Sequence, residues 1–187
     1  MIGTILLVVV ILILISILVA FVIIYNGLIR LRNNIDKSWA NIDVLLKQRS
    51  NEIPNLVNIV KGYMKHERET LESLTKARSF LTKTETLSQK AAVDGVITDF
   101  LKTIFMVAED YPTLKANENF LALQGRISGL ENELADRREF YNDSVTMYNT
   151  RIQSIPDLFV ARMLNFVRID LFEATEEEKE KVKVNLG

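Results

Sequence analysis

The chain has 187 residues, with 23 Lys and Arg against 24 Asp and Glu and a formal net charge of −1. This balance excludes the strongly basic surface that nucleic-acid binding requires, so we expect no nucleic-acid partner. The lack of cysteine excludes disulfides, thiol chemistry and cysteine-type zinc sites. Three prolines and seven glycines are too few for a turn-rich β fold, which favours an all-α protein.

An unbroken apolar run extends from Ile5 to Ile24, with Ser16 as the one polar residue, whose hydroxyl can bond a carbonyl of its own helix. About 20 helical residues rise about 30 Å, the thickness of the hydrocarbon core of a bilayer. A cleaved signal peptide is the alternative. It would have Lys or Arg before the run, a shorter core and a small-x-small cleavage site, and this segment has none of them. We therefore interpret residues 1–27 as a transmembrane anchor.

Basic residues follow the anchor and none precedes it, since Arg30, Arg32 and Lys37 all lie on its C-terminal side. The positive-inside rule predicts a single-pass protein of the cell membrane with its short N-terminus outside and its helical domain in the cytoplasm.

From Leu28 onward, apolar residues alternate at steps of three and four, which is typical of the seam of a coiled coil or slender bundle. The stripe comprises Leu28, Leu31, Ile35, Trp39, Ile42, Leu46, Ile53, Leu56, Val60 and Tyr63, and continues more weakly at Leu74 and Leu81. Gly27 costs a helix only about 1 kcal/mol. We therefore predict one rod from the membrane to about Leu81, bent but not broken at Pro54.

Thr82 to Ser88 predicts the first reversal, and a second helix follows over about Ala91 to Asp110, ended by Tyr111-Pro112. After a loop through Lys115, Asn117 is expected to cap a third helix of about Asn119 to Ile155 by accepting a hydrogen bond from the Phe120 amide.

Ser154 to Asp157 matches a capping box and predicts a short final helix from Leu158 to about Phe172. The predicted fold is all-α: a single N-terminal transmembrane helix continues into a long antiparallel bundle of coiled-coil type, with three long helices and a short C-terminal one. The bundle domain covers residues 28–172, and a charged tail covers residues 173–187.

Adding the helix lengths places Pro156 at the end of the domain far from the bilayer, next to a broadly apolar final helix. The candidate interaction residues of this final helix are Leu158, Phe159, Leu164, Phe166 and Val167. This helix either caps its own bundle or contacts a neighbouring subunit, a partner or a second membrane.

Few polar residues suggest chemistry. His66, beside Glu67, is the single histidine, and one histidine without cysteine does not build an ordinary zinc site. Tyr141 and Tyr148 are interpreted as an aromatic core with hydroxyls at its rim, and a ligand cage is the alternative.

Arg49 and Arg138 replace apolar residues on the seams of the first and third helices. They either extend to the edge of the bundle or pair with buried acids and fix the register of the helices.

Motifs distributed over nearly the whole chain resemble the LemA family. They include Tyr25-Asn26-Gly27-Leu28, Trp39 to Arg49, Ile53 to Val57, Val60 to Tyr63 with His66-Glu67, Tyr111-Pro112, Leu114 to Phe120, Arg137-Arg138, Phe140-Tyr141-Asn142, Tyr148-Asn149 and Phe172-Glu173-Ala174. Asn165-Phe166 departs from the pattern, because the family more often has a Gly-Phe turn there.

The resemblance implies a membrane anchor with an external N-terminus, an α-helical bundle and no agreed biochemical activity. One branch of the family builds organelle-like internal membranes, and others are linked to envelope upkeep and to membrane metalloproteases.

We therefore expect a membrane scaffold or assembly protein, with a transmembrane signalling adaptor as the alternative and an enzyme as unlikely. The expected partners are the lipid bilayer, further copies of the chain through Trp39 and Ile42, and an unidentified membrane protein. No cofactor, metal or small-molecule substrate is expected.

Overall fold

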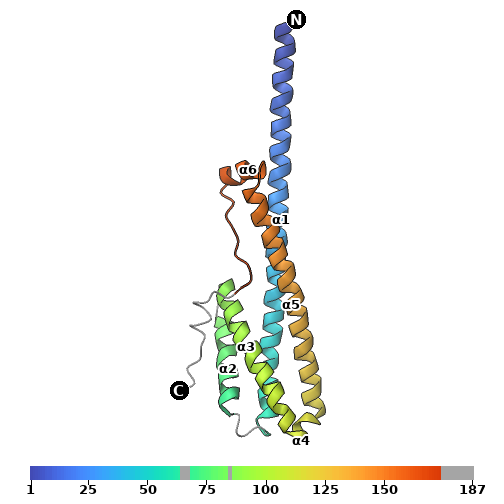
Figure 1. Cartoon of the computed structure of the whole chain (residues 1–187), viewed down its shortest axis with the longest axis vertical. Helices are drawn as coiled ribbons and strands as arrows, with labels where there is room; N and C mark the ends of the chain where they lie inside the picture. Colours follow the sequence, from blue (N-terminus) through green and yellow to red (C-terminus); the bar gives the residue numbers. More distant parts are fainter. Residues whose placement is uncertain (64–67, 84–85, 174–187) are drawn as a thin grey trace. The chain divides into compact units, whose positions relative to one another are not determined.

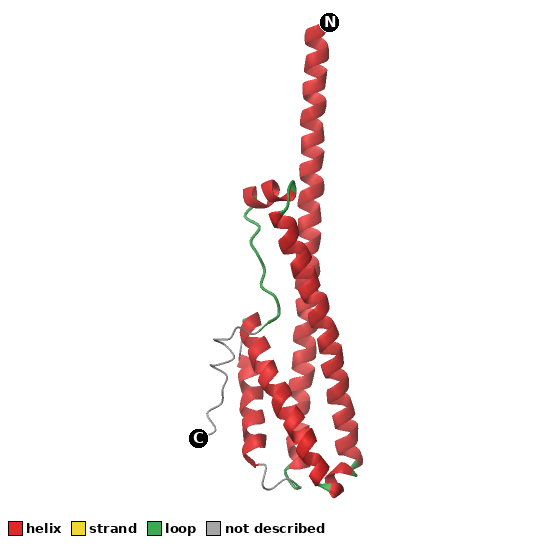
Figure 2. Cartoon of the chain, in the orientation of Figure 1, coloured by secondary structure: helices red, strands yellow, loops and turns green. Residues whose placement is uncertain are grey.

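The computed structural model describes residues 1–63, 68–83 and 86–173 of the chain. All regular structure within these ranges is helical, and no strand occurs among them (Figure 2). The predicted all-α class is therefore confirmed. His66 and Glu67 lie outside the described residues, as do residues 174–187 of the predicted tail.

The first helix, α1, extends over 59 residues from Ile2 to Val60 (Figure 1). It continues through Gly27 and Pro54, as the sequence predicts. Its N-terminal part is long and apolar enough to cross a membrane, and none of that part is buried in the protein. The Ser16 hydroxyl donates to the Ile13 carbonyl at 2.8 Å, so it is satisfied within the helix.

The prediction of one rod to about Leu81 is wrong, because α1 ends at Val60. The Tyr63 amide donates to the Val60 carbonyl at 2.9 Å in a tight turn, and Gly62 in this turn has low helix propensity. A separate helix, α2, extends from Arg68 to Lys83. The break predicted near residues 82–88 is therefore the second break in the helical pattern, not the first.

The next helix, α3, extends from Leu87 to Val107 and is capped by Thr86. A single 3-10 turn, η2 (Ala108–Asp110), follows, and Tyr111 then leaves the helical region before Pro112, as predicted. The predicted loop through Lys115 is instead a short helix, α4 (Pro112–Lys115). Proline at the first position of a helix already has the required φ, which explains this turn.

The long helix α5 extends from Glu118 to Gln153. The Asn117 side chain accepts a hydrogen bond from the Phe120 amide at 3.0 Å, which confirms the predicted cap.

The last helix, α6, extends only from Asp157 to Met163, and the predicted capping box is wrong. The Ser154 hydroxyl donates to the Thr150 carbonyl at 2.8 Å, and the Asp157 carboxylate accepts from Arg151 at 2.6 Å. Neither side chain is available to cap α6, whose N-cap residue is Pro156.

Asn165, with φ of 54°, ends α6 well before Phe172. Its amide donates to the Arg162 carbonyl at 3.4 Å, and the Phe166 amide donates to the Ala161 carbonyl at 2.9 Å. These two bonds form a Schellman motif, which normally has glycine at the left-handed position. Asparagine tolerates this conformation, so Asn165 forms the turn without a glycine.

The described residues divide into two compact units, which we describe separately: unit 1 comprises 1–39 and 140–171, and unit 2 comprises the described part of 40–139 with residues 172 and 173. In unit 2, two ion pairs show that α1 and α3 run parallel, since Asp43 pairs with Lys90 and Arg49 pairs with Asp94.

Within the same unit, α5 runs antiparallel to α1, because Arg49 pairs with Glu131 and Glu52 pairs with Arg126. The fully buried apolar residues between these helices include Leu46, Ile53, Leu56, Ile97, Leu101, Ile104, Ile127 and Leu134.

In unit 1, α1 and the C-terminal part of α5 also run antiparallel. Trp39 packs edge to face on Tyr141, with ring centroids 6.3 Å apart, and Gly27 lies against Arg151. A Cβ atom at residue 27 would lie 2.9 Å from the Arg151 guanidinium, so glycine permits this close approach.

Candidate functional site

A buried charge cluster holds the helices of unit 2 together. Arg49 of α1 is 2% exposed, and one terminal nitrogen donates to Asp94 of α3 at 2.5 Å. Its other terminal nitrogen donates to Thr98 of α3 at 2.8 Å and to Glu131 of α5 at 2.7 Å. Arg138 of α5 pairs with the second carboxylate oxygen of Asp94. One buried aspartate therefore binds arginines from two other helices.

Burial dominates the electrostatics of this cluster. Desolvation lowers the pKa of Arg49 from its usual range, and the Glu131 carboxylate opposes that shift. Desolvation, together with the positive charge of Arg49, lowers the pKa of Arg138 to about 10. The Arg138 guanidinium therefore remains charged at neutral pH. The Arg138 guanidinium also lies 4.9 Å from the centre of the Phe172 ring, a favourable cation–π distance.

The cluster confirms that Arg49 and Arg138 pair with buried acids rather than extending to the edge. Their partners, Asp94 and Glu131, were not predicted from the sequence. An acid next to Val93, in the apolar stripe of α3, was an available signal for Asp94. The Nε atoms of both arginines are buried without a hydrogen-bond partner among the described residues. Part of the desolvation cost is therefore not recovered.

A second ionic contact of unit 2 centres on Asp43, which binds Lys90 at 2.5 Å and Lys47 at 2.7 Å. Burial alone would raise the pKa of Asp43, but the two lysines outweigh it and leave the pKa below its usual value.

A polar hollow of about 480 Å³ lies elsewhere on unit 2, between α1 and α5. Its polar lining is formed by the Glu52–Arg126 ion pair and by the side chains of Asn55, Asn58 and Asn119. These amides and paired charges can form hydrogen bonds with a polar ligand. Among the described residues, no group of three or more His, Cys, Asp or Glu side chains is placed to hold a metal ion.

In unit 1, a row of side chains on α5 holds the extended segment that follows α6. The Tyr141 and Tyr148 hydroxyls donate to the carbonyls of Asp170 and Val167, each at 3.1 Å. The Asn149 side chain donates to the Ile169 carbonyl at 2.8 Å and accepts from the Ile169 amide at 3.1 Å.

Both tyrosines of this row are almost fully buried, which fits an aromatic core with hydroxyls at its rim. Burial, with Asp170 and Asp36 nearby, raises the pKa of Tyr141 to about 12. Burial also raises the pKa of Tyr148, against the opposing charge of Arg32.

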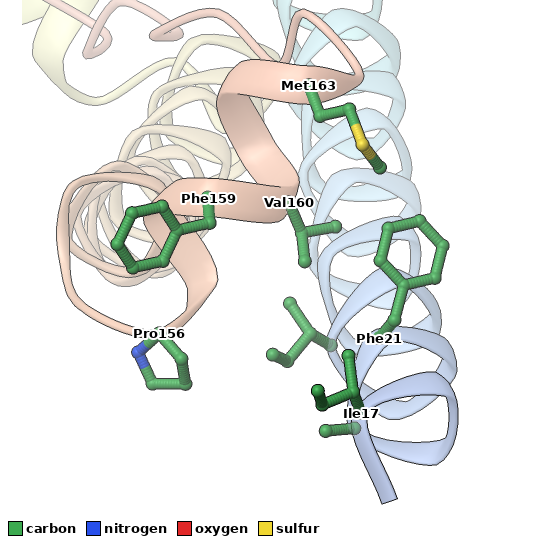
Figure 3. A pocket seen from close by; sticks show the side chains of 8 residues that line it. Ile17, Phe21, Pro156, Phe159, Val160 and Met163 are labelled. Atoms are coloured by element: carbon green, nitrogen blue, oxygen red, sulfur yellow. The ribbon is translucent and has the colours of Figure 1, made fainter. Parts of the chain in front are cut away.

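The membrane-proximal pocket lies in the same unit, between α6 and the apolar run of α1 (Figure 3). Its volume is about 280 Å³, and all eight lining residues are apolar: Ile17, Ala20, Phe21 and Ile24 from α1, and Pro156, Phe159, Val160 and Met163 from α6 or its start. The prediction that Pro156 lies at the end far from the membrane is therefore wrong. The unpredicted break after Val60 adds one reversal, so α5 leads back toward the apolar run.

The predicted interaction residues are placed in different environments. Ile42 is fully buried within its own chain, and Trp39 is half-buried. Phe166 packs against Tyr25, with ring centroids 6.4 Å apart. Leu158 is half-buried, whereas Phe159, Leu164 and Val167 are exposed.

Comparison with known proteins gives matches over most of the chain. Residues 38–186 match the LemA family model. Protein LemA of Metamycoplasma hominis is 30% identical over 159 residues, which cover 82% of this chain and 71% of that protein.

Two magnetosome proteins are more distant matches. Magnetosome protein MamQ of Magnetospirillum gryphiswaldense is 20% identical over 174 residues, covering 79% of this chain. Magnetosome protein MamQ 2 of Paramagnetospirillum magneticum is 21% identical over 175 residues, covering 80%. The match spans 64% of the length of each of these two proteins.

Proposed function

Because the chain belongs to the LemA family, we propose that it is a membrane-anchored helical scaffold that assembles with further copies of itself. The family resemblance predicted from the dispersed motifs is confirmed by the same matches. The two magnetosome relatives support a place at a membrane. The proposed orientation keeps the helical domain in the cytoplasm, on the side of the basic residues that follow the apolar run.

The observation that carries the proposal is the continuity of α1. The helix that contains the apolar run also supplies Arg49, around which α3 and α5 pack. An anchor joined to its domain by a flexible linker would leave the domain free to tumble. A helix shared by the anchor and the domain suits a protein that presents helical surfaces at the membrane.

The contact between copies is proposed to lie on α5. Phe140 and Met147 are 58% and 57% exposed, and their spacing of seven residues places them on one face of the helix. Aromatic and methionine side chains are enriched in protein interfaces. Since Ile42 is buried in its own chain, this face is a better candidate for assembly than the stripe of α1.

Disulfide crosslinking tests this proposal, because the chain contains no natural cysteine. Met147→Cys is introduced, and membranes are oxidised before electrophoresis without reductant. We expect a covalent dimer from Met147→Cys and little from Thr146→Cys, an exposed neighbour that points about 100° away around the helix. Monomer alone from Met147→Cys and from Phe140→Cys, with a monomeric mass in mild detergent, would contradict the proposal.

A signalling adaptor is the second candidate, and the same continuous helix favours it. An adaptor requires two states, so the labelling rate of Met147→Cys would change when conditions on the external side of the membrane are changed. A scaffold predicts a constant rate.

A further inference from the structure

The apolar surface of unit 1 continues from the membrane helix onto α6. The α1 side of the membrane-proximal pocket, Ile17 to Ile24, forms the last two turns of the apolar run. These residues span about 10 Å along the helix axis. An interfacial helix typically buries its apolar face about 5–10 Å into the boundary between headgroups and acyl chains. Since α6 contacts this part of α1, it lies at the depth of one leaflet.

Four large apolar side chains on and around α6 are largely exposed. Ile155, Phe159 and Met163 follow one another at steps of four and are 74%, 67% and 63% exposed, and Val167 is 66% exposed. We call these four residues the leaflet face. Two of them, Phe159 and Met163, also line the pocket beside the apolar run of α1, so an acyl-chain environment would cover both surfaces together.

Several polar groups at the two ends of α6 have partners within the protein, as a lipid environment requires. The Asp157 carboxylate is neutralised by Arg151 at 2.6 Å. The Leu158 amide donates to the Ser154 carbonyl at 2.8 Å, and the Schellman motif at Asn165 binds carbonyls of the last turn.

The charges near this surface fit phospholipid headgroups. Arg162 and Arg168 are exposed, and the ten residues after the apolar run contain Arg30 and Arg32 but no acid. Basic residues at the membrane surface attract anionic lipids.

We propose that the leaflet face inserts into the leaflet on the C-terminal side of the span, and that the membrane-proximal pocket holds an acyl chain of an anionic phospholipid. This inference rests on the membrane anchoring in the proposed function. It adds a lipid ligand and a second membrane contact to the single span.

Fluorescence quenching by lipids tests the proposal on the full chain. Trp39 is the one natural tryptophan, so Trp39→Phe provides the background for a tryptophan at residue 159. The variants are reconstituted in vesicles of phosphatidylcholine with brominated phosphatidylglycerol, whose bromine quenches only nearby tryptophan. We expect blue-shifted, strongly quenched emission from Phe159→Trp. Met106→Trp, at a residue of α3 that is 68% exposed against 67% for Phe159, is the unquenched control.

The outcomes separate this inference from the anchoring itself. Leu12→Trp lies in the middle of the apolar run and reports insertion. If Leu12→Trp is quenched and Phe159→Trp is not, the lipid contact is wrong while the anchor stands. If neither is quenched, membrane anchoring fails as well. Blue-shifted but unquenched emission from Phe159→Trp would place another protein surface on the leaflet face and also overturn the proposal.

Lipid preference tests the headgroup part of the proposal. Arg162→Gln and Arg168→Gln should each lower the preference for brominated phosphatidylglycerol over brominated phosphatidylcholine on the order of fivefold. Arg137→Gln, an exposed arginine of unit 2, is the matched control. An unchanged preference in both test variants would exclude anionic recognition.

If the Trp39→Phe variant does not fold, the tryptophan assay is replaced by cysteine labelling. The cysteine variants are then made in the chain that retains Trp39. In the same vesicles, Phe159→Cys should react with a water-soluble maleimide at least tenfold more slowly than Met106→Cys, whose residue is equally exposed in the protein. Equal rates would overturn the insertion.

Discussion

The Arg78 side chain donates a hydrogen bond from Nε to the backbone carbonyl of Ser50 at 2.8 Å. In an uninterrupted helix this carbonyl would accept from the amide of residue 54, but that residue is Pro54, which has no amide hydrogen. Arg78 of α2 therefore replaces the missing donor inside α1. This contact explains how α1 continues through a proline that would otherwise leave a carbonyl without a partner.

The first prediction is a coupling between these two positions. Arg78→Ala should lower the free energy of unfolding by about 1.5–3 kcal/mol, because it removes a charged donor from a partly buried carbonyl. In a Pro54→Ala background the amide of residue 54 donates to the Ser50 carbonyl. The loss of unfolding free energy caused by Arg78→Ala should therefore fall below about 1 kcal/mol. Urea unfolding of the four chains of this double-mutant cycle measures the difference.

Lys76→Ala is the control for this cycle, because residue 76 is exposed on the same helix. Equal losses from Arg78→Ala in both backgrounds would show that Arg78 does not substitute for the proline amide.

The second prediction concerns the shared aspartate of the charge cluster. Asp94→Asn should lower the free energy of unfolding by about 3–5 kcal/mol, because it leaves the buried Arg49 and the half-buried Arg138 with too little negative charge. Glu131→Gln should cost less, since Glu131 is 25% exposed and water can replace part of its contact. Thermal unfolding followed by circular dichroism compares the two variants, and a larger loss from Glu131→Gln would contradict this reading of the cluster.

The third prediction concerns alkaline pH. The pKa of Tyr141 is raised to about 12 in the folded chain, against 10.0 for an ordinary tyrosine. Its contribution to stability is therefore complete below pH 10 and is lost as the pH rises through about 12, because the unfolded chain ionises first. The loss amounts to no more than about 3 kcal/mol, from 1.36 kcal/mol per pKa unit.

Arg138, with a pKa of about 10, titrates in the same range, so the prediction is tested as a difference. The stability advantage of the natural chain over Tyr141→Phe should shrink between pH 10 and pH 12. Absorbance at 295 nm follows tyrosinate directly. A Tyr141 that ionises near pH 10 in the folded chain would contradict the burial of its hydroxyl.

Local signals predicted those parts of the fold that depend on one side chain and its neighbours in sequence. The cap at Asn117, the end of helix at Tyr111-Pro112 and the passage through Pro54 are of this kind. The break after Val60 was not predictable in the same way. Its one local signal is Gly62, and a glycine costs a helix only about 1 kcal/mol. Most of the stability of a helix in a protein comes from packing against other helices, and a short stretch of sequence does not reveal which helices pack together.

The break after Val60, which was not predicted, also explains why the partners of Arg49 and the neighbours of the final helix were not predicted. Arg49 was expected to meet a buried acid, but its partners Asp94 and Glu131 depend on the directions in which α3 and α5 run. The apolar face of the final helix was recognised, whereas its position beside Ile17–Ile24 depends on the same extra reversal. Residue types were therefore predictable, and their partners were not.

The last prediction concerns Asn165, which ends α6 with φ of 54°. Glycine adopts this conformation without steric cost, so Asn165→Gly should preserve the turn and raise the free energy of unfolding by up to about 1 kcal/mol. Asn165→Val should lower it by about 1–3 kcal/mol, because a β-branched residue is strongly disfavoured there. The Phe166 amide, which closes the Schellman motif, should exchange its hydrogen faster in Asn165→Val than in the natural chain, and Asn165→Gly should not show this increase.

Thr146→Val is the control, because residue 146 is exposed on α5 and the variant reports the loss of helix propensity on introducing valine. Equal protection of the Phe166 amide in the valine and glycine variants would mean that the left-handed turn does not determine where α6 ends.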